Sequence, residues 1–179
     1  MTDRVMVFID GTNLLSSAMT NGVRIDFAEL LRVLVNKRKL VTAVFVDSIN
    51  PENMEGRLRL YETIRPLGYE TEVLTLAKKP DSGRWTEKGL DVAVATDMIR
   101  AAASDSYDVA VLVSGDADYC PAVRGVQGYG KKVEAAAFNS AASKDLIGYA
   151  DAFIALDGLF PPVRDAVGPA GRPRITRPE

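Results

Sequence analysis

Two apolar stretches of the chain end in aspartates. The segment VLVSGDADYCPAV (111–123) predicts the end of a buried strand, with Asp116 and Asp118 in the residues that follow it. The segment RVMVFID (4–10) ends in the same way at Asp10. In open parallel sheets, ligands bind just outside the carboxyl ends of the strands. If these two strands are neighbours, the three carboxylates share one edge of the sheet and form a candidate site.

A fourth aspartate is expected beside them. Asp91 lies about one turn into a predicted helix, and the apolar residues at 94, 95 and 98 would face the sheet, so Asp91 should point inward. Two carboxylates about 4–5 Å apart repel by roughly 3–4 kcal/mol at an effective dielectric near 20. Lys88 brings only one positive charge, so a divalent cation is the simplest way to stabilise four carboxylates. Oxygen ligands favour Mg²⁺ or Mn²⁺ over zinc.

Each of these acids also has a purely structural interpretation. Asp118 could cap the short helix around Pro121, and Asp116 and Asp10 could be turn residues beside glycine. Asp91 is the hardest to explain in this way, because lone buried acids are rare. The convergence of all four acids favours the chemical interpretation.

Two other acids are expected to be structural. Asp47 also follows an apolar stretch, and it is predicted to be a turn residue ahead of a helix that opens at Asn50-Pro51. Asp97 lies about 120° around its helix from Asp91 and three residues before Arg100. This spacing predicts a surface ion pair between Asp97 and Arg100.

Composition excludes several kinds of chemistry. The chain has 179 residues, 47% hydrophobic and 26% charged, which is typical of one soluble domain with an ample core. It contains no histidine, which excludes Ser-His-Asp and Cys-His nucleophilic schemes, histidine metal sites and imidazole acid–base catalysis. The single cysteine, Cys120, excludes an internal disulfide and a cysteine-based zinc cluster. Carboxylates, hydroxyls, lysines or a bound metal must therefore carry any reaction.

The same sequence predicts a cytoplasmic protein. No apolar stretch approaches the roughly 20 residues that span a bilayer, so no membrane partner is expected. The N-terminal residues MTDRVMVFID pass straight into a strand, without a basic region or a cleavage site. The cytoplasm is the default expectation for such a chain.

Strand and helix patterns alternate along the chain. Short apolar runs predict strands, and apolar residues at helical spacing or terminal signals predict helices. The near-continuous apolar strands predict a mainly parallel sheet covered on both faces, which is the α/β fold class with three α/β/α layers. The predicted strands are 4–10, 40–47, 69–76, 108–114, 131–138 and 152–156, and the main predicted helices are 26–38, 50–67 and 87–103.

The end of the chain differs from the rest. Residues 161–179 are rich in Pro, Gly and Arg without apolar periodicity, and this tail is predicted to be disordered. It carries a net charge of +2, which leaves −4 on the predicted domain, residues 1–160. The tail could be a basic arm for nucleic acid or a solvated end without a role.

Three motifs together resemble a known family. FIDGTN (8–13), KGLDVAVATDM (88–98) and LVSGDADYCPAV (112–123), in this order and spacing, resemble the NYN/LabA-like branch of the PIN nuclease superfamily. The resemblance extends from about Val5 to Leu156 and implies a PIN-like α/β/α sandwich that cleaves RNA with a divalent metal. By motif position, the family's acidic metal-binding set corresponds to Asp10, Asp91, Asp116 and Asp118, and its neighbouring polar residues to Asn13 and Ser114.

The resemblance leads to a hypothesis of metal-dependent RNA hydrolysis. Asn13 could hydrogen-bond Asp10 or a substrate phosphate, and the Ser114 hydroxyl could fix the orientation of an aspartate. Substrate contacts are expected from a basic loop (77–89), where cations can meet phosphates and an aromatic ring can stack on a base. The residues of this loop are Lys78, Lys79, Arg84, Trp85 and Lys88.

Other functions remain to be weighed. The main alternative is a non-catalytic or regulatory RNA-binding module that retains the acidic pocket. A haloacid-dehalogenase-like phosphatase would need a nucleophilic aspartate where this chain has Phe8, and a dinucleotide-binding Rossmann domain would need GxGxxG after the first strand. Tyr119 and Tyr129 could lie in the core or at an interface, which leaves a homodimer open.

Overall fold

A six-stranded sheet forms the middle layer of the molecule. The computed structural model describes residues 2–163. The strand order is β3-β2-β1-β6-β7-β8, and every pairing in this sheet is parallel, which confirms the predicted fold class. The strands are β1 (Arg4–Asp10), β2 (Lys39–Ile49), β3 (Tyr69–Thr75), β6 (Val109–Val113), β7 (Lys132–Ala137) and β8 (Ala152–Ala155).

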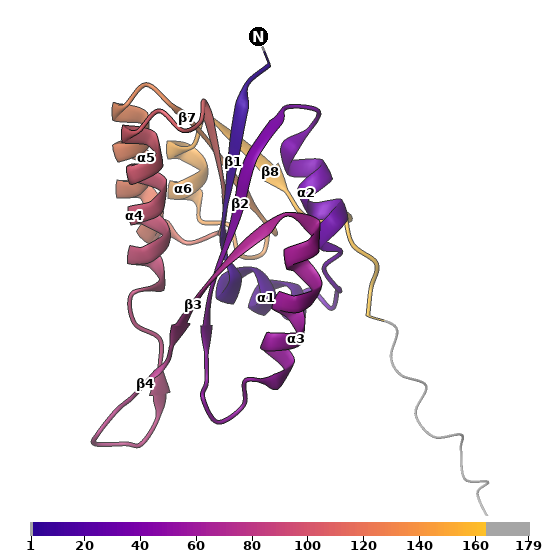
Figure 1. Cartoon of the computed structure of the whole chain (residues 1–179), viewed down its shortest axis with the longest axis vertical. Coiled ribbons are helices and arrows are strands. Elements are labelled where there is room, and N and C mark those ends of the chain that lie inside the picture. Colours follow the sequence, from indigo (N-terminus) through magenta and orange to yellow (C-terminus); the bar gives the residue numbers. More distant parts are fainter. Residues whose placement is uncertain (1, 164–179) are drawn as a thin grey trace, which may run out of the picture.

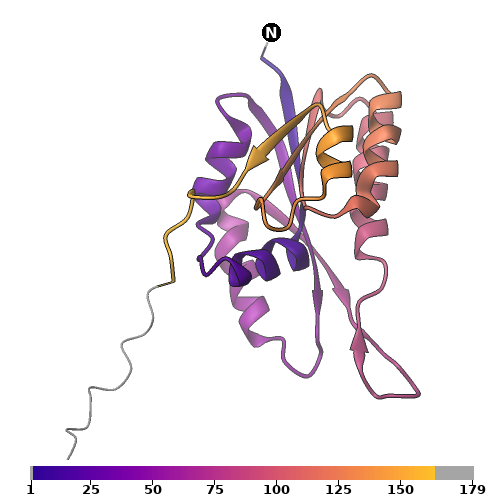
Figure 2. The same cartoon turned by 180° about the vertical axis from the view of Figure 1, so that it is seen from behind.

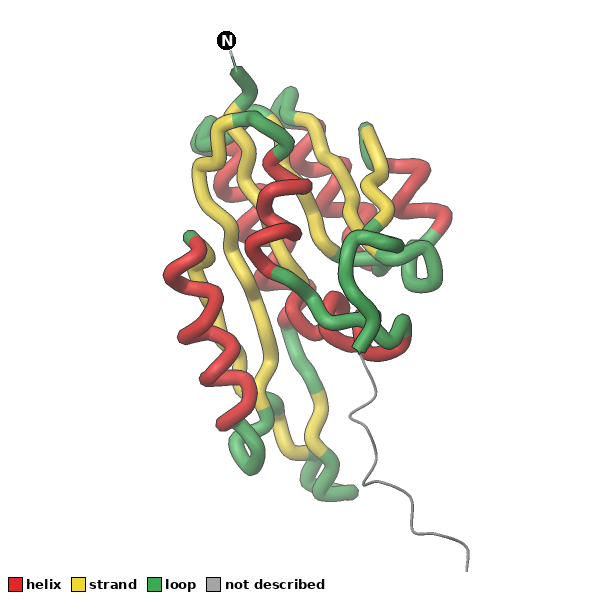
Figure 3. Tube along the Cα trace, turned by 90° about the vertical axis from the view of Figure 1, so that its right-hand side faces the viewer, coloured by secondary structure: helices red, strands yellow, loops and turns green. Residues whose placement is uncertain are grey.

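Helices cover both faces of this sheet. Figure 1 shows α1, α2 and α3 on one side and α4, α5 and α6 on the other, and Figure 3 shows helices in front of the strands and behind them. The helices are α1 (Gly11–Thr20), α2 (Phe27–Val35), α3 (Glu55–Ile64), α4 (Leu90–Ala103), α5 (Cys120–Gly128) and α6 (Lys144–Tyr149). Short 3₁₀ turns, η1 (Arg65–Leu67) and η2 (Ala117–Tyr119), follow α3 and precede α5.

The central strands bring two of the sequence motifs together. Strands β1 and β6 pair directly, from Val5 opposite Val109 to Ile9 opposite Val113. Each strand carries apolar residues on both sides because the two helix layers bury both faces. The residues that follow this pairing, Asp10 and Ser114, therefore leave the sheet side by side.

Two glycines allow the chain to turn closely at these strand ends. Gly11 begins α1 directly after β1, and a Cβ atom there would lie 2.6 Å from the ring of Phe45. At Gly115 a Cβ atom would overlap the carbonyl oxygen of Ala141. Both motifs need glycine for close packing, since a side chain at either position would displace a neighbour.

Several boundaries differ from the sequence prediction. Helix α1 was not predicted, and α3 begins at Glu55 rather than at Asn50-Pro51. Gly68, which ends the η1 turn after α3, has a left-handed backbone with φ of 100°. Asp26 caps α2 by accepting a hydrogen bond from the Glu29 backbone. The Asn50 side chain instead closes a turn ahead of α3, by accepting from the Glu52 backbone at 2.9 Å.

Asp47 was wrongly predicted to be a turn residue. Strand β2 continues through Asp47 to Ile49, and Asp47 is fully buried. Its Oδ2 atom accepts a hydrogen bond from the Tyr61 hydroxyl at 2.9 Å and pairs with Arg57 at 3.2 Å. An acid can remain inside a strand when the protein supplies its counter-charge and hydrogen bonds.

The last described residues lie against the domain. Arg24 donates to the Pro161 carbonyl, and Val163 donates to the Gly22 carbonyl, so the first residues of the predicted tail pair with the loop between α1 and α2 (Figure 2). The remainder of that tail, 164–179, lies outside the described residues. Within residues 2–163, no helix combines the length and apolarity needed to cross a membrane.

We predict that Gly115→Ala destabilises the protein by about 1–3 kcal/mol, because the added methyl group overlaps the Ala141 backbone. Thermal unfolding should show a melting temperature lower by about 2–4 °C for each kcal/mol. The matched control is Gly148→Ala in α6, where nothing lies within 4 Å of the added atom. This control should be neutral or slightly stabilising. Equal melting temperatures for the wild type and Gly115→Ala would contradict the packing argument.

Candidate functional site

A polar hollow lies at the carboxyl ends of β1 and β6. Its volume is about 260 Å³, and it brings together Asp10 and Asp116, two of the four predicted acids. The side chains that line it offer hydroxyl, amide and carboxylate groups, and no lysine or arginine is among them. The lining residues are Asp10, Thr12, Asn13, Ser16, Ser17, Glu87 and Asp116.

Asp10 is held at the base of this hollow by hydrogen bonds to both carboxylate oxygens. It caps α1 by accepting from the Asn13 backbone at 2.8 Å, and it accepts from the Tyr119 hydroxyl at 3.0 Å. Asp10 is only 7% exposed. Burial raises its pKa to about 6 against the opposing effect of these two hydrogen bonds, and the charges of Glu87 and Asp116 add to the increase.

The second acid, Asp116, is exposed and belongs to the loop after β6. Its Oδ1 atom accepts from the Asp118 backbone at 3.0 Å and so caps η2. The capping role considered for Asp118 is wrong, because α5, the helix that contains Pro121, has no side-chain cap, and Asp116 caps η2 instead. The buried Ser114 hydroxyl accepts from the Asp116 backbone at 3.3 Å, and Asn13 Oδ1 accepts from the Gly115 backbone at 3.2 Å. The Asn13–Gly115 bond joins the two strand ends, and the other two bonds hold the loop after β6 in place.

Asp91 and Asp118 lie outside the lining of the hollow, and both are exposed. The inward orientation predicted for Asp91 is wrong, because Asp91 is exposed, whereas Leu90, Val94 and Met98 of the same helix are buried. At about 100° per residue, Asp91 lies only about 20° around the helix from Met98, so its exposure reflects its place in the first turn of α4 and not its direction around the helix. Asp91 nevertheless lies on the same side as the hollow, since its charge contributes to the raised pKa of Tyr119, whose main cause is burial and whose next is Asp10.

Five residues of this region were not predicted to belong to the site: Thr12, Ser16, Ser17 and Glu87, which line the hollow, and Tyr119, which contacts Asp10. The Glu87 carboxylate accepts from the Thr12 hydroxyl at 2.8 Å, and the same hydroxyl lies 3.3 Å from Asp47 Oδ1. Tyr119 is buried and anchors Asp10, whereas Tyr129 is 53% exposed. A signal for Glu87 was present, since it stands next to Lys88 in TEKGLD, directly ahead of the predicted helix. The sequence position of Glu87 does not predict the direction of its side chain.

The charges in the hollow are not matched by the protein itself. Among residues 2–163, no lysine or arginine forms an ion pair with any of the four predicted aspartates, and Lys88 is exposed. Nor do the described residues contain three acidic or cysteine side chains already arranged to hold a metal ion. Mg²⁺ commonly binds through one or two carboxylates and completes its shell with waters and substrate phosphate. The donor set of the hollow fits such a hard cation.

The predicted basic loop forms a hairpin beside the hollow. Strands β4 (Ala77–Lys78) and β5 (Trp85–Thr86) pair in an antiparallel fashion, and the hairpin projects from the domain between β3 and α4 (Figure 1). Lys79 and Arg84 are exposed at its turn, and Trp85 is half-buried. Because Glu87 follows Trp85 by two residues, the hairpin leads directly into the hollow.

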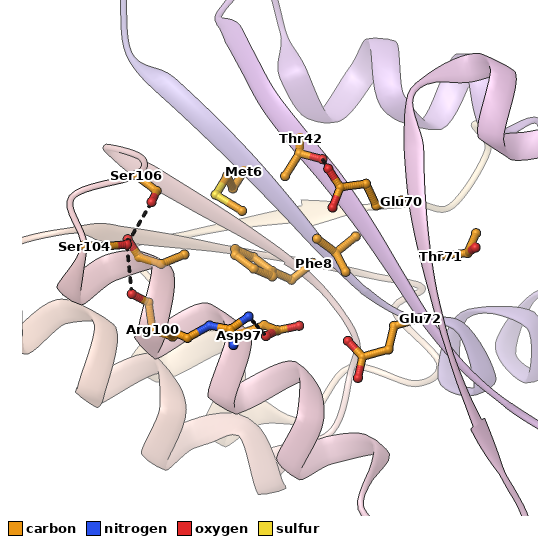
Figure 4. A pocket seen from close by; sticks show the side chains of 12 residues that line it. Met6, Phe8, Thr42, Glu70, Thr71, Glu72, Asp97, Arg100, Ser104 and Ser106 are labelled. Atoms are coloured by element: carbon orange, nitrogen blue, oxygen red, sulfur yellow. Dashed lines mark hydrogen bonds and ion pairs between the residues drawn. The ribbon is translucent and has the colours of Figure 1, made fainter.

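A second hollow, of about 450 Å³, lies between α4 and strands β1 to β3 (Figure 4). Asp97 pairs there with Arg100 at 2.8 Å, which confirms the predicted ion pair. Burial and the nearby Asp97 raise the pKa of Glu72. This hollow contains the early residues Met6 and Thr42 of their strands, so it lies away from Asp10. Its acids make it a poor site for a phosphate group.

Comparisons with known proteins agree with the motifs. A family model described as the NYN domain matches residues 4–157. The chain is similar to the low amplitude and bright protein LabA of Synechococcus elongatus, with 23% identity over 163 residues that cover 87% of this chain and 85% of LabA. A solved structure from Vibrio parahaemolyticus, VPA0982, a protein of unknown function, has a TM-score of 0.73 and 24% identity. That match covers 89% of this chain and 96% of VPA0982, and it shows the fold.

The raised pKa of Asp10 predicts a pH-dependent stability in the absence of divalent metal. The folded-state pKa of about 6 exceeds the ordinary 3.8, so the folded protein binds the proton more tightly than the unfolded chain does. The free energy of unfolding should therefore fall by about 2–3 kcal/mol as pH rises from about 4 through 6. Asp10→Asn should remove this decrease and should be more stable than the wild type at pH 7 in EDTA.

Chemical denaturation at several pH values measures this effect. Asn also caps helices well, so the Asp10→Asn variant should keep its fold. Asp118→Asn serves as the comparison, because Asp118 is exposed and is not among the groups that raise the pKa of Asp10. Identical pH profiles for the wild type and Asp10→Asn would show that Asp10 is not destabilised by its burial.

Proposed function

The chain belongs to the NYN domain family of the PIN-like superfamily, and from this premise we propose that it is a divalent-metal-dependent ribonuclease. Proteins of this family are generally nucleases, and NYN nucleases act on RNA. The observation that carries the proposal is the environment of Asp10. Its carboxylate is almost fully buried, its pKa is raised to about 6, and Glu87 and Asp116 add negative charge without a basic partner among residues 2–163.

Asp10 and Asp116 are the proposed direct ligands of a Mg²⁺ or Mn²⁺ ion, and Glu87 is a third carboxylate within the same hollow. Asp91 and Asp118, which are exposed at its margin, would contribute directly or through bridging water. Such an ion supplies Lewis-acid stabilisation of phosphate charge and makes water a stronger nucleophile near neutral pH. This chemistry needs no histidine, in agreement with the composition.

The surrounding side chains would position these groups. Tyr119 holds one oxygen of Asp10 and fixes the orientation of the carboxylate, and Thr12 does the same for Glu87. Asn13 uses its amide oxygen to bind the Gly115 backbone, so its NH₂ group is a donor for a substrate phosphate oxygen. Ser114 keeps the Asp116 backbone in place.

The hairpin is the proposed substrate-binding element. Segment 77–89 carries four basic and two acidic side chains, while residues 1–160 together have a net charge of −4. Lys79, Arg84 and Lys88 are exposed and available to phosphates, and the Trp85 ring is available to stack on an unpaired base. Since this positive segment adjoins the acidic hollow, RNA held by it would pass over Asp10 and Asp116.

A second candidate function is a non-catalytic or regulatory RNA-binding module that retains the acidic pocket. The observation that favours it is the absence, within residues 2–163, of three ligands already arranged for a metal ion. Such a module would bind RNA through the hairpin without turnover. The distinction therefore depends on cleavage and not on RNA binding.

For the nuclease, we expect cleavage of labelled RNA with Mg²⁺ or Mn²⁺ and none in EDTA. Asp10→Asn and Asp116→Asn should each lower the rate by at least about 100-fold, because each removes a charged ligand. Asp97→Asn is the matched control, since that carboxylate pairs with Arg100 away from the hollow, and its rate should stay near that of the wild type. RNA binding without cleavage in either metal would favour the module instead.

Trp85→Ala should weaken binding of single-stranded RNA by about 5- to 100-fold, since stacking contributes about 1–3 kcal/mol per base. Fluorescence anisotropy of labelled RNA in EDTA measures affinity without cleavage. Trp85→Phe keeps an aromatic face but loses the indole N–H, and it should lose less affinity than Trp85→Ala. Equal losses for the two variants would argue against stacking at this position.

A further inference from the structure

The Glu52 carboxylate accepts hydrogen bonds from two side chains of the hairpin, Lys78 and Trp85. Glu52 Oε1 lies 3.2 Å from Lys78 Nζ, and Glu52 Oε2 accepts from Trp85 Nε1 at 3.1 Å. Lys78 and Trp85 are direct partners across the two strands, and the ammonium group lies 5.1 Å from the centre of the indole ring. The two donors therefore converge on a single anionic group.

Glu52 reaches the hairpin from another part of the chain. It belongs to the turn between β2 and α3, which is closed by bonds from the Glu52 and Asn53 backbones to Asn50. The hydrogen bond from Trp85 and, next in effect, the one from Lys78 lower the pKa of Glu52, so its carboxylate is charged at neutral pH. The contact thus joins an acidic turn to the element proposed to bind RNA.

A phosphodiester group could take the place of this carboxylate. Both groups present two oxygens that share a negative charge, and both accept from ammonium and indole N–H donors. The Lys78 and Glu52 side chains are 52% and 63% exposed. An exposed ion pair of this kind contributes at most about 1 kcal/mol, so a phosphate can displace it.

We propose that Lys78 and Trp85 form a phosphate subsite for RNA, and that Glu52 is an internal competitor that fills this subsite until RNA binds. The inference rests on the proposed function, in that RNA is the ligand. Trp85 precedes Glu87 by two residues, a separation of at most about 7 Å along the chain, so the subsite adjoins the acidic hollow. Glu52 would favour RNA that offers a phosphate at this position over weaker polyanion contacts.

The test is the affinity of Glu52→Gln for fluorescein-labelled single-stranded RNA, measured by anisotropy in EDTA at several salt concentrations. Removing the competing charge should lower Kd by about 3- to 5-fold. The slope of log K against log salt should become steeper by about 0.7, the value for one more phosphate contact on a single strand. Trp85 is the single tryptophan of the chain, so its fluorescence also reports whether the hairpin has the same conformation in the variant as in the wild type.

Glu55→Gln is the matched control. Glu55 begins α3 three residues later and pairs with Arg59, so its loss removes the same charge without touching the hairpin. In the double variant Glu52→Gln with Lys78→Gln, the gain in affinity should disappear. The proposal is overturned if both single variants strengthen binding equally, if Glu52→Gln binds no better than the wild type, or if the wild type binds no RNA. Normal binding without cleavage would overturn the nuclease proposal and leave this one intact.

Discussion

The unfavourable burial of the Asp10 carboxylate is the constraint on which the rest of the site depends. Its two oxygens are bonded to the Asn13 backbone and to Tyr119, yet its pKa is still raised to about 6 because burial and two neighbouring acids outweigh those bonds. A cation that enters the hollow would stabilise the charged carboxylate of Asp10 and, with it, the folded protein. The stability of the domain, the proposed metal binding and the proposed chemistry are thereby linked through one side chain.

Asp47 shows that the same fold can neutralise a buried acid when it needs no ligand. It lies on the adjacent strand, is fully buried, and is matched by Arg57 and Tyr61. The Thr12 hydroxyl lies within hydrogen-bond distance of both Asp47 and Glu87. It therefore connects Asp47, whose charge is neutralised by Arg57, to the acids of the hollow. The contrast between Asp47 and Asp10 distinguishes a structural carboxylate from a candidate ligand better than burial alone.

The hairpin adds a separate electrostatic element to this edge of the sheet. The domain as a whole is acidic, which opposes indiscriminate binding of nucleic acid. Positive charge is instead concentrated in the hairpin next to the hollow, and in our proposal Glu52 offsets part of that charge until a phosphate group binds. In this proposal the hairpin would attract RNA and the acidic hollow would attract a cation. Because the two charges lie on separate, adjoining elements, neither would weaken the other.

The sequence by itself determined the parallel α/β sheet, the positions of its strands, the family, and the meeting of Asp10 with the Ser114–Asp118 loop. These follow from apolar periodicity and from the rule that parallel strands end at one edge. Only the tertiary structure decided that Asp91 is exposed, that Asp116 and not Asp118 caps η2, that Asp47 is buried, and that Glu87 enters the hollow. Such features depend on where a helix begins relative to the sheet and on partners distant in the chain, such as Arg57 for Asp47 and Thr12 for Glu87, which local residue patterns do not specify.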